Sequence, residues 1–154
     1  MKFSTKEDVE APIDAVFAMM CDFETFERAA MRRGAEVQRT DTMTAPGVGL
    51  SWRAAFMLRG KRRQVELEIV TFDKPNEIVI ECRSQGLLTL VTMELVALSK
   101  NRTRIMMSFD IKPLNLSARL LVQSLKLAKT SLTKKYKLRV AEFAKSLEDR
   151  YKNA

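Results

Sequence analysis

A long run of alternating apolar and polar side chains constrains the fold of this 154-residue chain more than any other feature. The alternation extends from residue 35 to residue 112. It is typical of strands that bury one face, and turn residues between such strands favour antiparallel hairpins. We therefore expect a meander of six antiparallel strands with one apolar and one charged face. Turn residues interrupt the run at 45–47, 59–61, 73–76, 84–86 and 99–101.

The segments on either side of this run predict one more strand and three helices. Residues 3–9 alternate but are polar enough for a strand at the edge of the sheet. Pro12 stands where a short helix would begin, and Asp22 would cap a second helix that ends at Gly34. Residues 115–151 contain neither proline nor glycine and repeat apolar side chains every three or four positions. They predict one long C-terminal helix.

The predicted order of elements resembles the helix-grip fold of the SRPBCC superfamily, also described as START-like, polyketide cyclase/dehydrase-like or Bet v 1-like. This α+β fold is a curved antiparallel seven-stranded sheet wrapped around a long C-terminal helix, with two short helices after the first strand. The resemblance covers essentially the whole chain, so we expect a single domain over residues 1–154. Its most specific local signs are VEAPIDAVF at 9–17, MCDFE at 20–24, PGVG at 46–49 and NRTRI at 101–105.

The resemblance implies a cavity between the sheet and the C-terminal helix that holds an apolar ligand. The residues give an independent reason to expect one, since a strongly curved sheet cannot close tightly on a helix along its whole length. Nine methionines and eight phenylalanines would make the interior adaptable. Each candidate lining residue can also be explained as ordinary core. The candidates are Trp52, Phe56, Leu67, Ile69, Ile80, Met93, Leu95, Met107, Phe109, Leu125, Leu132 and Tyr136.

Four polar residues also have positions that would face the cavity. Tyr136 would present its phenol either to a ligand or at the rim of the core. Arg139 falls within the face of the helix that should be dry. It would bind a ligand carboxylate or phosphate there, unless its stem reaches water beyond the sheet. Arg39 and Asp41 would lie at the cavity mouth or, as we favour, form an ion pair on an edge strand.

The sequence excludes several kinds of chemistry. It contains no histidine, which removes every mechanism in which imidazole is an acid, a base or a metal ligand. Cys21 and Cys82 are far apart and have apolar neighbours, so we expect two buried thiols rather than a disulfide or a metal site. We expect neither a metal nor a cofactor. A cyclase, dehydrase or hydrolase with an inward carboxylate or tyrosine stays open as an alternative function.

The net charge of +8 is concentrated near the C-terminus. Residues 119–152 carry ten Lys or Arg and three Asp or Glu. Lysines beside exposed leucines are typical of a helix that contacts an anionic membrane or a partner groove, although a solvated lysine face is the commoner explanation. Nucleic acid is disfavoured because this face lacks aromatic side chains. The candidate membrane contacts are Lys126, Leu127, Lys134, Lys137 and Leu138.

The beginning of the chain bears on localisation. Residues 1–8 lack the apolar core of a signal peptide, and Glu94 interrupts the longest apolar run, residues 86–98. We therefore expect a soluble cytoplasmic protein. The sequence as a whole predicts non-covalent binding, or transport, of a hydrophobic small molecule or lipid. An interaction module that uses the basic helix is a further alternative, and the oligomeric state has no signal in the sequence.

Overall fold

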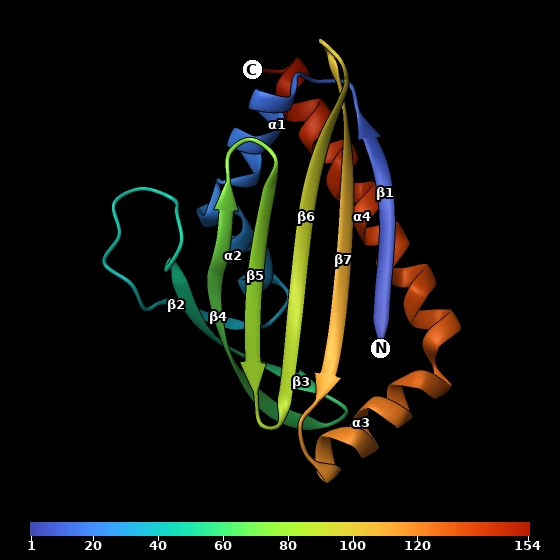
Figure 1. Ribbon diagram of the computed structural model, residues 1–154. Coiled ribbons are helices and arrows are strands. Elements are labelled where there is room, and N and C mark those ends of the chain that lie inside the picture. Colours follow the sequence, from blue (N-terminus) through green and yellow to red (C-terminus); the bar gives the residue numbers. More distant parts are fainter.

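Seven strands form one antiparallel sheet in the computed structural model, which describes residues 1–154 (Figure 1). The strands are β1 (Lys2–Val9), β2 (Glu36–Arg39), β3 (Ser51–Leu58), β4 (Lys61–Asp73), β5 (Glu77–Ser84), β6 (Leu87–Ser99) and β7 (Arg102–Pro113). Their order across the sheet is β1-β7-β6-β5-β4-β3-β2. The predicted six-stranded meander and the first strand at the edge of the sheet are both confirmed.

Four helices cover one face of this sheet (Figure 1). They are α1 (Ile13–Met20), α2 (Phe23–Arg32), α3 (Leu116–Leu127) and α4 (Lys129–Lys152). Pro12 is the N-cap of α1, as predicted. Asp22 occupies the N-cap position of α2, but its carboxylate accepts a hydrogen bond from the Thr25 hydroxyl at 2.7 Å rather than from a backbone N–H. Gly34, with φ of 92°, follows α2 as expected.

The prediction of one helix over residues 115–151 is wrong in one respect, because the helix breaks at Ala128. The backbone there has φ of −103° and ψ of 14°. The two parts bury different surfaces: α3 packs on β7 through Ala118, Val122 and Leu125, whereas α4 packs mainly on β1. A straight helix could not follow both directions. Figure 1 shows α3 crossing the lower end of the sheet at an angle to the 24-residue α4.

Bulges and tight turns give the sheet its curvature. The register of β4 against β5 shifts between Ile69 and Thr71, and that of β6 against β7 shifts between Ala97 and Ser99. A bulge bends its strand and increases the twist. The two-residue turn between β3 and β4 has positive φ at both Arg59 and Gly60, a geometry that matches the twist of a hairpin.

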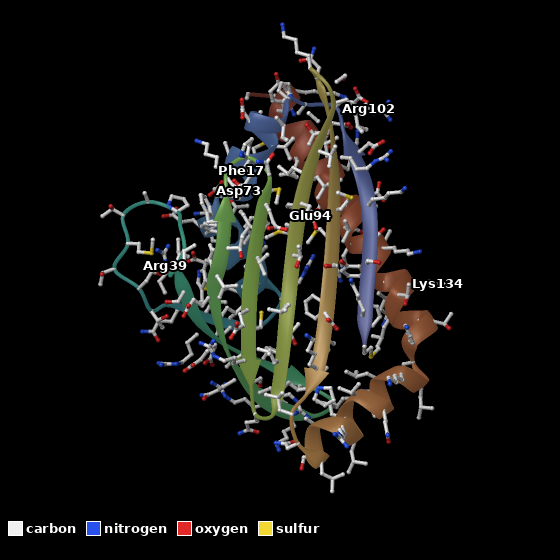
Figure 2. The ribbon with its side chains drawn as sticks, in the orientation of Figure 1. Phe17, Arg39, Asp73, Glu94, Arg102 and Lys134 are labelled. Carbon is white, nitrogen blue, oxygen red and sulfur yellow. The ribbon has the colours of Figure 1, made fainter.

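The most deeply buried side chains gather where α1 and the C-terminal part of α4 meet the sheet. Val9, Phe17, Ile78, Ile105 and Leu147 are almost completely buried there. The rings of Phe17 and Phe72 meet edge to face, with centroids 5.4 Å apart. Figure 2 shows Phe17 on α1 near this upper end of the sheet. The dry core therefore lies at one end of the molecule, opposite the end that α3 covers.

The other face of the sheet carries charges, as the alternation predicts. Glu94 lies near the middle of β6 on this face, away from the helices (Figure 2). Arg53 and Glu66 face each other across β3 and β4 with their nearest charged atoms 3.9 Å apart. Exposed pairs of this kind contribute about 0–1 kcal/mol each, so this face mainly provides solubility and register.

Candidate ligand-binding site

A cavity of about 490 Å³ lies between the inner face of the sheet and the helices α3 and α4. Its volume is within the range of small-molecule sites, about 300–1,000 Å³. The break at Ala128 lets both helices roof it, through Leu121 and Leu125 of α3 and Leu132 and Tyr136 of α4. The side chains from the strands are Phe3, Phe56, Leu58, Arg63, Val65, Leu67, Cys82, Ser84, Leu87, Thr89, Val91, Phe109 and Ile111.

The register of the strands explains why these residues share one face. Leu67 pairs with Cys82, Cys82 with Thr89, and Thr89 with Ile111. Directly paired residues point to the same side of a sheet, so these four form a row across β4, β5, β6 and β7. Alternate residues along each strand therefore build an almost continuous apolar floor, with 14 of the 17 lining residues hydrophobic.

A second cavity, of about 320 Å³, adjoins the first beneath α2. Leu67 and Val91 line both cavities. Glu27 is the one charged residue in the smaller lining, and its carboxylate accepts a hydrogen bond of 3.3 Å from the indole N–H of Trp52. The remaining lining is hydrophobic: Met20, Phe23, Phe26, Ala30, Val37, Ala54, Ile80, Met93, Met107 and Phe143, in addition to Trp52, Leu67 and Val91.

A third hollow, of about 610 Å³, crosses β1, β6 and β7 but differs in character. Polar side chains such as Lys6, Thr92, Glu94 and Ser108 make up most of its lining. It offers an apolar ligand little dry surface, so the two apolar cavities are the better candidates for a site.

Ten of the thirteen predicted ligand-binding residues line one or both apolar cavities. Ile69 and Leu95 do not, because both are packed in the dry core, where Leu95 pairs with the fully buried Ile105. Arg139 is exposed and lies in neither lining. The ten are Trp52, Phe56, Leu67, Ile80, Met93, Met107, Phe109, Leu125, Leu132 and Tyr136.

Arg139 lies outside the site because of the way α4 packs. The buried residues of α4 are Val140, Ala144 and Leu147, and Arg139 falls beside this stripe rather than within it. Its side chain therefore reaches water, which is the alternative that the sequence left open.

Two buried polar atoms of the larger cavity have no hydrogen-bond partner. They are Nε of Arg63 and the hydroxyl of Tyr136, and no other buried side-chain nitrogen or oxygen in the protein lacks a partner. Arg63 also forms no ion pair. Because nearly all buried polar groups in proteins are hydrogen-bonded, the two atoms mark unused donor capacity at the cavity.

Burial keeps the phenol and the thiol of the larger cavity protonated near neutral pH. Burial raises the pKa of the Tyr136 phenol above its ordinary value. Burial also raises the pKa of the Cys82 thiol, to about 11, so the reactive thiolate is scarce. No Asp or Glu lines this cavity. Its polar side chains therefore include hydrogen-bond donors and a cation but no anion.

Arg63 was not among the residues predicted for the site, although the sequence contains a signal for it. It has the same parity along β4 as Val65, Leu67 and Ile69, so an inward-facing arginine could have been inferred from the alternation. The many outward-facing arginines of the meander obscured this signal.

Arg39 and Asp41 form the ion pair that the sequence favoured. Two hydrogen bonds of 2.8 Å join them at the base of the β2–β3 loop, where Figure 2 shows Arg39. Asp41 also accepts the backbone N–H groups of Met43 and Ser51. The Arg39 guanidinium and these backbone donors hold the pKa of Asp41 well below its ordinary value. The pair therefore stabilises the loop rather than lining either apolar cavity.

Cys21 and Cys82 are both free and half-buried. No cluster of three or more His, Cys, Asp or Glu side chains could hold a metal ion. No helix combines the length and the apolar composition needed to span a bilayer.

The candidate membrane contacts are exposed but divided between two helices. Lys126 and Leu127 end α3, and the exposed fraction of Leu127 reaches 93%. Lys134, Lys137 and Leu138 belong to α4. Figure 2 shows Lys134 projecting outward from the beginning of α4.

Comparisons with known proteins identify the fold. No family model and no curated protein sequence matches the chain. Among solved structures, TTHA0849 from Thermus thermophilus has a TM-score of 0.66 at 16% identity, covering 97% of this chain and 96% of its own. The Zhui aromatase/cyclase from Streptomyces sp. R1128 has a TM-score of 0.61 at 14% identity, covering 87% and 88%.

A plant enzyme is similar to the same extent. A point mutant of norcoclaurine synthase from Thalictrum, in complex with a transition-state analogue, has a TM-score of 0.65 at 12% identity and covers 95% of this chain and 94% of its own. At these identities the similarity establishes the fold rather than the activity. The chain has the helix-grip fold that its sequence predicted.

Proposed function

We propose that the protein binds a hydrophobic small molecule or lipid non-covalently in the larger cavity. The observation that carries this proposal is a space of about 490 Å³ with 14 hydrophobic residues among its 17 lining residues. Burial of apolar ligand surface there would contribute about 25 cal/mol per Å². The norcoclaurine synthase complex supports the proposal, because it shows a protein of this fold holding a small molecule.

We expect a ligand to enter the cavity beside α3. A single side-chain hydrogen bond joins the β3–β4 turn to this helix, from the guanidinium of Arg59 to the backbone carbonyl of Ser124 at 3.5 Å. A bond of that length is weak. The polar attachment of α3 to the turn is therefore slight, and the apolar packing of Ala118, Val122 and Leu125 on β7 is what a displacement of α3 would have to overcome.

Extraction and a neutral fluorescent probe would test the proposal. Organic extraction of the purified protein followed by mass spectrometry should reveal a bound apolar compound. The delipidated protein should bind Nile red, and Leu132→Trp should weaken this binding because the larger indole ring occupies part of the cavity. Leu120→Trp is the matched control, because Leu120 is exposed on α3.

Two outcomes would count against binding in this cavity. One is the absence of any extracted compound together with no thermal shift from fatty acids, sterols or aromatic compounds. The other is unchanged Nile red binding in a folded Leu132→Trp variant.

An enzyme of the polyketide cyclase/dehydrase or hydrolase type is the alternative, and its candidate groups are Glu27 and Tyr136. Glu27 is the inward carboxylate that such a mechanism needs, although it lies in the smaller cavity. The test is turnover of a poly-β-ketone analogue. Loss of this turnover in Glu27→Gln or Tyr136→Phe, with binding of the analogue retained, would favour the enzyme over simple binding.

We also propose that the basic C-terminal region contacts an anionic membrane. Residues 111–141 contain eight Lys or Arg and no Asp or Glu. Leu116, Leu120 and Leu127 of α3 are respectively 73%, 60% and 93% exposed between these cations. Exposed leucines among lysines suit the interface of an anionic bilayer. Because α3 also roofs the larger cavity, this contact would place the ligand entrance at the lipid surface.

Flotation with vesicles of phosphatidylcholine and phosphatidylglycerol would test this contact. The combined substitutions Lys126→Glu, Lys134→Glu and Lys137→Glu should abolish binding. The control, Lys6→Glu with Lys74→Glu and Lys100→Glu, changes the net charge equally at exposed positions outside the basic region. Binding that survives the first set, or that both sets abolish equally, would contradict a membrane contact at this surface.

A further inference from the structure

Arg63 differs from the neighbouring arginines of the sheet because it faces the cavity. Arg62, next to it, points to the other face and binds the carboxylate of Glu36 at 2.8 Å. Arg83 in β5 similarly binds Glu81. Arg63 has no such partner, and its cross-strand neighbour is the aromatic Phe56. The sheet therefore directs one cation to the larger cavity without a counter-charge.

The geometry of a guanidinium indicates what would satisfy Arg63. Its planar N–H donors match the two oxygens of a carboxylate, and such charge-assisted hydrogen bonds are about twice as strong as neutral ones. The residues that line the cavity around Arg63 include no acid. An anionic oxygen group on a ligand would supply the missing counter-charge.

Tyr136 provides a second polar position on a different wall of the cavity. Its ring packs against Phe3 of β1, with centroids 5.9 Å apart. Arg63 lies on β4, and β5, β6 and β7 separate that strand from β1 in the sheet. The two unpartnered polar groups thus lie on either side of an apolar floor that includes Cys82, Val91 and Phe109.

We propose that the ligand is an amphipathic acid whose anionic oxygen group binds Arg63. Its apolar body lies on the floor of the sheet, and a second oxygen, remote from the acid, accepts a hydrogen bond from the Tyr136 hydroxyl. This inference rests on the proposed binding function and adds the chemical class of the ligand. It accounts for both unpartnered polar atoms at once.

A panel of ligands with equal chain length would test the acid-binding role of Arg63. The affinity of each compound is measured by its displacement of Nile red from the delipidated protein. The compounds are dodecanoic acid, its methyl ester, dodecan-1-ol and 12-hydroxydodecanoic acid. The acid should bind at least about tenfold more tightly than the ester or the alcohol. Arg63→Met should abolish this preference while the alcohol still binds. Arg62→Met, which removes an equal charge from the other face, should keep it.

The hydroxy acid tests the second position. It should bind more tightly than dodecanoic acid to the wild-type protein, and Tyr136→Phe should remove this gain but keep the preference for acid over alcohol. Far-ultraviolet circular dichroism verifies that each variant is folded, and Arg63→Gln replaces Arg63→Met if the latter does not fold.

The outcomes separate this inference from the proposed function. Equal binding of acid, ester and alcohol to the wild-type protein would overturn the acid site and leave apolar binding intact. The same loss of acid preference in Arg62→Met as in Arg63→Met would also overturn it, because the effect would then reflect net charge alone. Failure of Nile red and of every panel member to bind would instead overturn the binding function.

Discussion

The ring of Tyr136 packs on the ring of Phe3 and thereby joins the last helix to the first strand at the edge of the larger cavity. The hydroxyl of the same side chain is buried and has no partner. The ring and the hydroxyl should therefore have opposite effects on the stability of the ligand-free protein. An unpaired buried hydroxyl is destabilising, whereas aromatic burial is stabilising.

Tyr136→Phe should leave the free energy of unfolding unchanged or raise it by up to about 1 kcal/mol, because it removes only the unpaired hydroxyl. Tyr136→Ala should lower it by about 3 kcal/mol, because the ring contact with Phe3 is lost. Urea unfolding of the delipidated protein measures both changes. A loss of more than about 1 kcal/mol in Tyr136→Phe would show that the hydroxyl has a partner in solution.

Leu132 and Leu147 provide a second test, since they are the same residue type on the same helix. Leu147 is 1% exposed and belongs to the dry core, so Leu147→Ala should cost about 2–5 kcal/mol. Leu132 already faces a cavity, and Leu132→Ala should cost less than about 2 kcal/mol because few packing contacts are lost. Urea unfolding without ligand gives the comparison. Equal losses at the two positions would mean that no cavity exists beside Leu132.

The lining of the site could largely be predicted because strand alternation determines which side chains face inward. Trp52, Leu67 and Phe109 follow from a period of two and from the requirement that an apolar face be covered. Ile69 and Leu95 have the same inward parity but lie in the dry core. Parity alone cannot distinguish these positions, because it does not tell which helix covers each part of the sheet.

Other features depend on tertiary contacts that have no local signal. The break at Ala128 involves neither proline nor glycine, and arises because α3 packs on β7 while α4 packs on β1. The bulge between Ile69 and Thr71 reverses the parity of β4, so that Phe72 can reach Phe17. The break lets both helices roof the larger cavity and the bulge completes the dry core, and neither could be predicted from the alternation of residues.

The position of α3 depends on the turn at Gly86, which suggests a test with a matched glycine. Gly86 and Gly60 have φ of 75° and 73°, so alanine would meet a similar backbone cost of about 1–2 kcal/mol at each. A methyl group at Gly86 would also collide with the side chain of Asn115, whereas nothing lies close to Gly60. Asn115 caps α3 by accepting the backbone N–H of Ala118 at 2.9 Å.

Gly86→Ala should therefore destabilise the protein by about 1 kcal/mol more than Gly60→Ala does. This difference is the typical contribution of an N-cap to stability. Urea unfolding compares the two variants. Faster Nile red exchange in Gly86→Ala is also expected, because α3 roofs the larger cavity. Identical stability losses in the two variants would show that Asn115 adjusts without losing its cap.

Acid titration should reveal the ion pairs of Asp8. Its carboxylate accepts hydrogen bonds from Arg104 at 2.8 Å and from Arg102 at 3.2 Å. The hydrogen bond and charge of Arg104, with help from Arg102, lower the pKa of Asp8 in the folded protein. The stabilisation is therefore complete above the unfolded pKa of about 3.9 and is lost as the pH falls through the lower folded pKa.

Asp8→Asn should lower the free energy of unfolding by up to about 1 kcal/mol at pH 7, since the pair is partly exposed. The difference from the wild type should shrink as the pH falls below about 3.9, because Asp8 then binds a proton more readily in the unfolded wild-type protein than in the folded one. Asp73→Asn is the control, because Asp73 is exposed and forms no ion pair. Urea unfolding between about pH 3 and pH 7 gives all three curves. If the difference for Asp8→Asn instead stays constant across this range, the stabilising effect of Asp8 does not depend on its charge. The geometry of its hydrogen bonds would then be what joins β1 to β7 at this point.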